Sequence, residues 1–264
     1  CIRDSSRASR KEILESLASQ GVAVTGLSWL ESMISISGYD YLESLESFRN
    51  GWIQVQDVTS ALVSELADPK EGDYIIDVCA APGGKSLHLA DKLKGTGMVE
   101  ARDLSEQKVA MIEENMARFG ASNIKAVVWD ALVTDEDARE KADIVIADLP
   151  CSGLGIIGKK PDIKYNMTME KMAELASLQR EILAASWEYV KPGGTLVYST
   201  CTIDTKENEE NARWLLSRFP LEPVDLTNRV GNAFDEPSLK EGMIQFLPGI
   251  HPFDGFFISV FRRK

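Results

Sequence analysis

Long apolar runs are missing from this sequence, and cysteines are few. No stretch approaches the roughly 18 consecutive apolar residues of a membrane helix, and no basic segment followed by an apolar one opens the chain. We therefore expect no membrane partner, no secretion and a cytoplasmic location. The 4 cysteines are widely spaced without a Cys-x-x-Cys pair, which argues against a zinc site and against a disulfide framework. We expect no metal, and each cysteine is interpreted singly.

Basic residues are also scarce. The chain has 29 Lys and Arg against 41 Asp and Glu, a formal net charge of -12. Nucleic-acid binding normally needs a basic surface, so an RNA partner requires cations that gather on one face. The candidates are Lys159, Lys160, Lys164, Arg262, Arg263 and Lys264, and, near the N-terminus, Arg3, Arg7, Arg10 and Lys11. We expect the N-terminal group and the lysines after residue 158 to form one basic face.

The first 50 residues differ in pattern from the rest. Residues 10–20 carry apolar side chains at helical spacing, behind a capping box of Ser9 and Glu12. Residues 22–24 have the composition of a strand. Residues 1–50 are therefore predicted to be a small α+β appendage, which would bind RNA if the chain acts on it.

Residues 51–264 are predicted to form one α/β domain. From residue 73 an apolar strand, a Gly or polar turn and an amphipathic helix alternate several times. The expected strands are 74–79, 97–102, 124–129, 143–148, 194–200, 243–247 and 256–262, and the expected helices are 56–66, 85–93, 105–119, 170–190 and 206–218. This alternation indicates a Rossmann-like, mostly parallel seven-stranded sheet with helices on both faces. Ligands bind such sheets at the carboxyl ends of the strands.

A glycine-containing loop follows the first of these strands. Its sequence from Asp77 to Ser86 is Asp-Val-Cys-Ala-Ala-Pro-Gly-Gly-Lys-Ser. Glycines let a ligand approach the backbone, and the free N–H groups of the next helix attract a carboxylate or phosphate. The loop is neither G-x-G-x-x-G nor a Walker loop. The alternative is a plain strand-to-helix turn, which does not need a Pro-Gly-Gly run.

Acidic residues follow the next two strands. Asp103 is placed to accept both hydroxyls of a ribose, and the carboxylate of Asp130 could accept an adenine amino group. Each could instead cap the segment that follows it. Three polar strand ends in succession favour an adenosine pocket, which fits S-adenosylmethionine, although the spacing alone also allows a nicotinamide cofactor.

Two cysteines follow the fourth and fifth strands. Cys151 lies in Asp148-Leu-Pro-Cys-Ser-Gly153, and Cys201 lies in Ser199-Thr-Cys-Thr202. Such strand ends are neighbours in a doubly wound sheet, so both thiols are expected to face one pocket. Inert packing is the alternative for either cysteine, but their polar neighbours at carboxyl ends favour chemistry.

Four segments in this order resemble one family. They are residues 77–86, 148–153, 199–202 and Asp254-Gly-Phe-Phe257, with Gln56-Asp57 ahead of them. Together they resemble the Sun (also called Fmu) family of bacterial RNA 5-methylcytosine methyltransferases, in particular its small-subunit ribosomal RNA methyltransferase B group, from about residue 9 to the end. The resemblance implies an S-adenosylmethionine-dependent methyltransferase fold and an RNA (cytosine-5-)-methyltransferase. Its expected substrate is 16S ribosomal RNA, and we expect a monomer.

The resemblance also implies roles for individual residues. Cys201 would be the nucleophile that attacks carbon 6 of cytosine, and Cys151 would assist product release. Asp148 could share a proton at ring nitrogen 3, and Lys85 could orient these groups, unless it is only a surface lysine at the start of a helix. The family's cofactor contacts carry over to Cys79, Ala80, Ala81, Pro82, Gly83, Gly84, Lys85, Asp103, Asp130 and Asp148.

Two rival functions remain, and one feature of the family is missing. A DNA cytosine methyltransferase would use the Pro-Cys cysteine, Cys151, as its nucleophile, and the Thr-Cys segment argues against it. An inactive scaffold would not need both cysteines, Asp148 and the whole glycine loop. Full-length members carry an N-terminal NusB-like RNA-binding domain that is absent here, and the chain begins at Cys1 rather than Met. We therefore expect a fragment or a shortened member.

Overall fold

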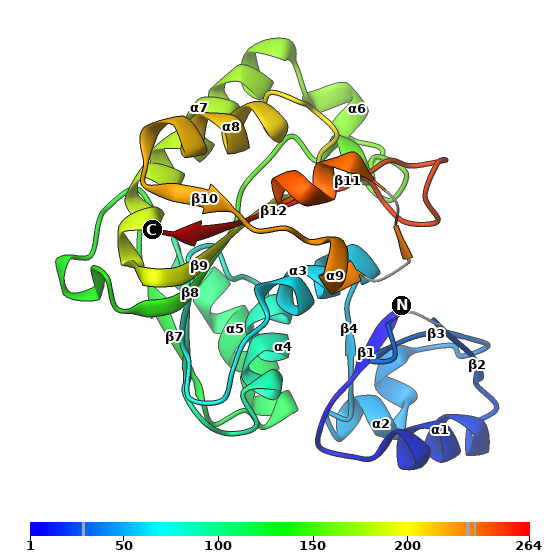
Figure 1. Cartoon of the computed structure of the whole chain (residues 1–264). Coiled ribbons are helices and arrows are strands. Elements are labelled where there is room, and N and C mark those ends of the chain that lie inside the picture. Colours follow the sequence, from blue (N-terminus) through cyan, green and yellow to red (C-terminus); the bar gives the residue numbers. More distant parts are fainter. Residues whose placement is uncertain (28–29, 231–232, 235) are drawn as a thin grey trace.

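Two separate β-sheets organise the chain (Figure 1). The computed structural model describes residues 1–27, 30–230, 233–234 and 236–264. One sheet has four strands in the order β2-β3-β1-β4, and the other has eight, in the order β10-β12-β9-β8-β5-β6-β7 with β11 paired to β12. Among the described residues, no helix is both long and apolar enough to span a membrane.

The four-stranded sheet belongs to the N-terminal unit. Its elements are β1 (Ile2–Asp4), α1 (Arg10–Ser19), β2 (Ala23–Gly26), β3 (Met33–Ser37), α2 (Glu46–Arg49) and β4 (Ile53–Val55). Helix α1 begins with the expected capping box, in which Glu12 N donates to Ser9 Oγ and Ser9 N donates to Glu12 Oε2. Strand β4 pairs with β1, so this sheet extends past residue 50.

The eight-stranded sheet contains every strand predicted after residue 73. Its parallel strands are β5 (Tyr74–Asp77), β6 (Met98–Asp103), β7 (Ile124–Val128), β8 (Ala142–Asp148) and β9 (Val190–Thr200), and its remaining strands are β10 (Leu221–Pro223), β11 (Met243–Phe246) and β12 (Phe256–Arg263). The predicted α/β fold is confirmed, with one strand more than the seven expected. The extra strand, β10, is three residues long with no alternating pattern, and antiparallel pairing with the end of β12 holds it.

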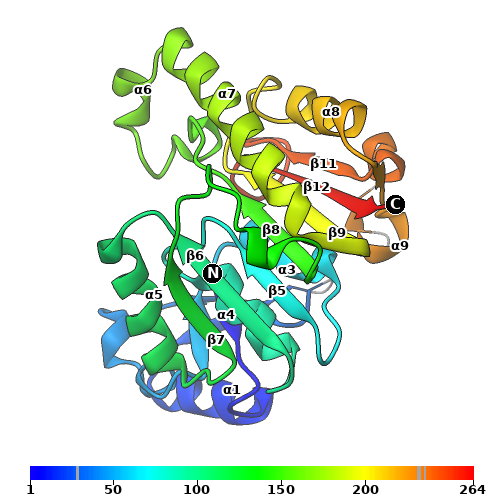
Figure 2. The ribbon, with the colours of Figure 1, turned by 90° about the vertical axis from the view of Figure 1, so that its left-hand side faces the viewer.

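Helices cover both faces of this sheet (Figures 1 and 2). They are α3 (Val58–Ala67), α4 (Gly84–Lys92), α5 (Glu106–Phe119), α6 (Ile163–Asn166), α7 (Met169–Ser186), α8 (Glu209–Arg218) and α9 (Thr227–Val230). Short 3-10 helices occupy Leu42–Ser44, Glu136–Ala138, Leu154–Ile156, Trp187–Tyr189 and Pro237–Glu241. Side chains of α3, α4 and α5 pack on one face, and those of α7 and α8 pack on the other.

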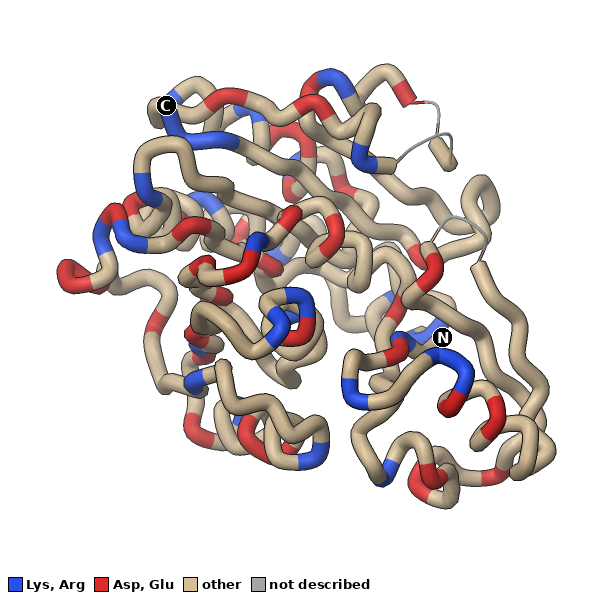
Figure 3. The backbone as a smooth tube through the Cα atoms, turned by 60° about the horizontal axis from the view of Figure 1, so that its bottom comes forward, with Lys and Arg blue, Asp and Glu red and all other residues tan. Residues whose placement is uncertain are grey.

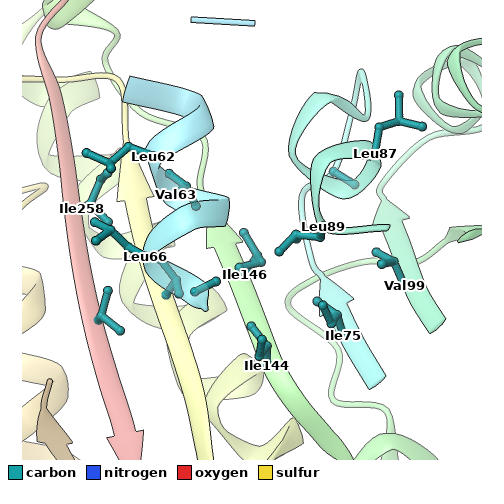
Figure 4. Close-up of a cluster of buried hydrophobic side chains, with 14 of the residues drawn as sticks. Leu62, Val63, Leu66, Ile75, Leu87, Leu89, Val99, Ile144, Ile146 and Ile258 are labelled. Carbon is teal, nitrogen blue, oxygen red and sulfur yellow. The ribbon is translucent and has the colours of Figure 1, made fainter. Parts of the chain in front are cut away.

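Alternating strand residues supply the two halves of the core. Ile144 and Ile146 of β8 belong to the cluster under α3 and α4, whereas Val145 belongs to the cluster under α7. This is the period of two expected for a strand that is buried on both faces. Figure 4 shows Leu66 of α3 and Leu89 of α4 pointing into the first cluster. The sheet, with the carboxyl ends of its strands, therefore lies between two layers of helices.

The expected basic face does not form, because its cations have partners inside the molecule. Blue and red segments lie side by side over the N-terminal unit in Figure 3. The partners are Asp91 for Arg3, the carbonyl oxygen of Phe119 for Arg7, Asp4 for Arg10 and Glu15 for Lys11. The expectation from sequence was wrong because Arg3 is buried against Asp91, 88 residues away, while Arg10 and Lys11 pair with carboxylates close to them in sequence.

Arg3 joins the N-terminal unit to α4. Its side chain is 1% exposed, and Nη1 lies 3.0 Å from Asp91 Oδ2. Nε donates to Gln56 Oε1 at 3.1 Å, and the guanidinium stacks over Phe119. Burial lowers the pKa of Arg3, and the neighbouring Asp91 opposes that effect. A buried cation held in this way is costly to remove, since its carboxylate partner loses its compensation.

We predict that Arg3→Met lowers the free energy of unfolding by about 2 to 4 kcal/mol. The methionine keeps most of the apolar stem, so the loss measures the charge and its hydrogen bonds. Lys11→Met is the matched control, because Lys11 pairs with Glu15 on an exposed helix face, where such pairs contribute little. Urea denaturation followed by circular dichroism measures both, and equal stabilities of the two variants would contradict the prediction.

Candidate active site

The predicted site residues lie at one edge of the eight-stranded sheet. Strands β5, β6, β8 and β9 are parallel, so their carboxyl ends open onto the same side. Asp148 stands opposite Ser199 in the register of β8 and β9, and Ser199 Oγ donates to Asp148 Oδ1 at 2.7 Å. The pairing of these two strands brings the two cysteine-containing segments together.

The glycine loop turns tightly from β5 into α4. Gly83 is the N-cap of α4 with φ +101°, and a Cβ built there would lie 3.4 Å from Ile112 Cγ2. The positive φ favours glycine at this position, whereas the contact by itself is one that a side chain could make. A Cβ at Gly84 would meet no atom within 4 Å, so open space lies beside the first turn of α4. The free N–H groups of that turn attract a negatively charged ligand group.

Asp77 anchors the beginning of the loop. It is buried, and Ser86 Oγ donates to its Oδ2 at 2.6 Å. Burial raises the pKa of Asp77 to about 7, although the hydrogen bond from Ser86 works in the opposite direction. The carboxyl group therefore changes charge near neutral pH, directly beneath the loop.

Asp103 contacts the loop rather than capping the next helix. Its carboxylate accepts hydrogen bonds from Ala81 N at 3.0 Å and Leu104 N at 2.8 Å. Lys108 Nζ lies 3.1 Å away. The cap of α5 is Ser105, so the capping alternative for Asp103 is wrong. Its carboxylate lies against the loop, as a pocket for the ribose of an adenosine requires.

Asp130 does cap a turn, as its alternative interpretation suggested. Its Oδ1 accepts a hydrogen bond from Leu132 N at 2.9 Å, directly after β7. Its adenine contact stays a prediction.

Sequence reasoning missed that large apolar side chains are exposed directly after these strands, namely Leu104, Leu132 and Val133. In the sequence, these apolar residues follow Asp103 and Asp130 within three positions. An exposed apolar surface of this kind can pack against a purine ring.

Lys85 pairs with Asp148 across the mouth of the site. Lys85 Nζ lies 2.5 Å from Asp148 Oδ2, and the lysine side chain is 12% exposed. It is not a surface lysine. Burial by itself would lower the pKa of Lys85, but the charge and hydrogen bond of Asp148 outweigh it, so the pKa is raised. Lys85 Nζ also lies 5.7 Å from the ring centre of Phe256, in the Asp-Gly-Phe-Phe segment.

The two cysteines meet, as expected. Cys151 Sγ and Cys201 Sγ are 3.3 Å apart, and neither residue is fully buried. The hydrogen bond with Cys151 lowers the pKa of Cys201, with help from the charge of Lys85, although burial opposes it. The same hydrogen bond, together with burial, raises the pKa of Cys151. The thiol of Cys201 is therefore the more acidic of the two.

The lysines after residue 158 border this edge. Lys159 Nζ lies 3.1 Å from Asp57 Oδ2 and 2.5 Å from Asp254 Oδ2. It therefore ties three segments together instead of standing free. Farther along, Tyr165 of α6 is 80% exposed. In the part of the chain that the structure describes, no group of three or more His, Cys, Asp or Glu side chains is arranged to hold a metal ion.

Comparison with known proteins finds relatives of one kind. Residues 64–262 match the family model described as 16S rRNA methyltransferase RsmB/F. A probable ribosomal RNA small subunit methyltransferase B of Bacillus subtilis is 38% identical over 261 residues, which are 98% of this chain and 58% of the relative. A ribosomal RNA small subunit methyltransferase F of Klebsiella pneumoniae is 32% identical over 260 residues, 96% of this chain and 54% of the relative. The chain thus spans little more than half of these relatives.

A solved structure shows the same fold. The crystal structure of a methyltransferase homolog protein from Pyrococcus horikoshii is 28% identical and superimposes with a TM-score of 0.84. The match covers 100% of this chain and 86% of that one. The N-terminal unit is included in the likeness, since no part of the chain is left outside it.

We predict that Cys201 reacts with iodoacetamide at least about three times faster than Cys79 at pH 7, because the thiolate is the reacting species. Both are half-buried, but the pKa of Cys201 is lowered and burial raises that of Cys79. Cys151→Ala removes the hydrogen-bond donor, so the pKa of Cys201 should rise and its alkylation at pH 7 should slow. Peptide mass spectrometry gives both rates. Equal rates for the two cysteines from pH 6 to 9 would refute the assignment.

Proposed function

The chain belongs to the 16S rRNA methyltransferase RsmB/F family, and from this premise we propose that it methylates carbon 5 of a cytosine in RNA, with S-adenosylmethionine as the methyl donor. Small-subunit ribosomal RNA is the proposed substrate, and the cytoplasm is the proposed location. The observation that carries the proposal is the pair of unlike thiols, Cys151 and Cys201, beside the Lys85–Asp148 ion pair.

The cofactor fits the residues at the ends of β5, β6 and β7. Open space beside Gly84 and the free N–H groups of α4 suit the carboxylate of its amino-acid part. Asp103 suits the ribose hydroxyls, because the exposed Lys108 can leave its carboxylate for water. Asp130 and the exposed apolar residues after β6 and β7 suit the adenine. When bound, S-adenosylmethionine supplies an electrophilic methyl group on a sulfonium.

Cys201 begins the proposed reaction. Carbon 5 of cytosine is a poor nucleophile, and attack of the Cys201 thiolate at carbon 6 converts the ring into an enamine whose carbon 5 can accept a methyl group. Ring nitrogen 3 gains a proton as the adduct forms, and Asp148 passes it on from Lys85 Nζ, which donates a hydrogen bond to Asp148. Lys85 holds Asp148 through the 2.5 Å ion pair, and its positive charge also favours the thiolate.

Cys151 assists the end of the proposed reaction. After methylation, carbon 5 carries both a proton and the new methyl group. Loss of that proton to a base and departure of the Cys201 sulfur restore the aromatic ring. Cys151 Sγ, 3.3 Å from Cys201 Sγ, is placed to donate its hydrogen bond to the departing sulfur. The DNA-type alternative, with Cys151 as nucleophile, requires the opposite order of the two thiol pKa values.

RNA contacts of the N-terminal unit are part of the proposal. Its arginines are engaged within the protein, but Tyr41 is 73% exposed and can stack on an unpaired base. The target cytosine must leave any helical stack to reach Cys201. A monomer is sufficient for this chemistry, because both cysteines, the ion pair and the glycine loop come from one chain.

Asp103→Ala is expected to weaken binding of S-adenosylmethionine about 10- to 100-fold, since hydrogen bonds to a charged partner contribute about 1 to 3 kcal/mol. Isothermal titration calorimetry measures the affinity, and thermal unfolding checks that the loop change leaves the fold intact. Asp137→Ala is the control, because Asp137 is exposed and lies in the 3-10 helix Glu136–Ala138. Unchanged affinity in Asp103→Ala would remove this residue from the site.

The two cysteines should give different variants. Cys201→Ala should abolish methyl transfer to ribosomal RNA while cofactor binding stays nearly intact, because the sulfur is needed only for the covalent step. Cys151→Ala should still attack but release product slowly, so a protein–RNA species linked through Cys201 should accumulate on denaturing electrophoresis. Cys1→Ala, at an exposed thiol, is the control. Should Cys201→Ala trap RNA while Cys151→Ala does not, the roles of the two cysteines are reversed.

A further inference from the structure

A buried carboxylate lies behind the two cysteines and has no role in the chemistry described so far. Glu207, between β9 and α8, is 0% exposed. Among the described residues, no Lys, Arg or His side chain lies within salt-bridge distance of it, unlike the many exposed carboxylates that are paired. Burying a carboxylate without a cation is costly. Such a group persists where hydrogen-bond donors converge on it.

The donors come from both sides of Cys151. Glu207 Oε2 accepts hydrogen bonds from Ser152 N and from Gln179 Nε2, each at 2.9 Å. Gln179 Nε2 also donates to Pro150 O at 2.8 Å. The residues before and after Cys151 are therefore both held by the Glu207–Gln179 pair. Helices α7, which carries Gln179, and α8 pack on the same face of the sheet (Figure 2).

The next residue holds the other cysteine in the same way. Asn208 Nδ2 donates to Thr202 O at 3.0 Å, and Thr200 Oγ1 donates to Asn208 Oδ1 at 2.5 Å. These two threonines flank Cys201. Two consecutive residues thus bracket one cysteine each, beside the direct hydrogen bond at 2.7 Å between Ser152 Oγ and Thr202 Oγ1.

We propose that Glu207 is a positioning residue that fixes the Pro150–Ser152 turn and thereby holds Cys151 Sγ against Cys201 Sγ. The effect of this positioning on catalysis rests on the proposed function. Glu207 touches no reacting atom, so its loss acts only through Cys151. When the turn is released, Cys151 no longer donates a hydrogen bond to Cys201. Product release then becomes slower and less of Cys201 is a thiolate, as in Cys151→Ala.

The first test compares adduct lifetimes on denaturing electrophoresis. Glu207→Ala should accumulate the Cys201-linked RNA species with a lifetime within about threefold of that of Cys151→Ala, and the double variant should be no worse than either, because the two changes remove one interaction. Glu207→Gln should release product within about threefold of the unaltered rate, since its side-chain oxygen can accept from Ser152 N and Gln179 Nε2. Additive effects, or no rescue by glutamine, would overturn the proposal.

Alkylation of Cys201 tests the same contact without methyl transfer. Glu207→Ala should slow the reaction with iodoacetamide at pH 7 to the rate of Cys151→Ala, whereas Glu210→Ala, at an exposed carboxylate in the first turn of α8, should match the unaltered protein. If the protein methylates no RNA, the proposed function fails, and the alkylation rates still decide the role of Glu207. An unchanged rate in Glu207→Ala would overturn that role.

A second variant tests the same contact if Glu207→Ala does not fold. Gln179→Leu removes the donor shared by Pro150 O and Glu207, and with it the acceptor of Tyr198 and Asn211, while leaving a side chain of similar size on α7. It should slow Cys201 alkylation in the same direction, by at least about twofold. A rate equal to that of the unaltered protein, in a variant with an unaltered circular dichroism spectrum, would contradict the proposed positioning role.

Discussion

The parallel pairing of β8 with β9 is the constraint on which the site depends. Its register sets Asp148 opposite Ser199, and Leu149 N donates to Ser199 O at 3.0 Å where the strands end. From this point the two chains diverge into the cysteine-containing segments. A shift of one residue in this register would turn one set of side chains to the opposite face. The ion pair, the thiol pair and the loop contacts all build on this alignment.

Unlike surroundings make two identical side chains chemically different. The hydrogen bond between the two sulfur atoms and the charge of Lys85 lower the pKa of Cys201, whereas Cys151 is held by the backbone contacts of its neighbours. The same hydrogen bond therefore has opposite effects on the two pKa values. In the proposed reaction, the different roles of nucleophile and assisting group follow from position, not from residue type.

The acidic composition is used inside the molecule as well as on its surface. Asp91 holds Arg3 and joins the N-terminal unit to α4, and Asp57 and Asp254 hold Lys159 beside the site. Cations that would otherwise attract phosphates are engaged as structural links. Under the proposed function, recognition of RNA would then depend less on a broad basic surface than on shape, aromatic contacts and the pocket around the cysteines.

Local patterns in the sequence were sufficient for the long elements and for the motifs. Short apolar runs between turns and amphipathic helices predicted the strands of the α/β sheet, and the Pro-Gly-Gly and cysteine segments marked its functional edge, because these signals lie within a few residues. Only the tertiary structure decided the short strands β1, β4 and β10, the partners of the N-terminal arginines and the burial of Glu207. Each depends on contacts such as Arg3 with Asp91 or Glu207 with Ser152, whose partners are far apart in the chain and leave no periodic pattern in the sequence.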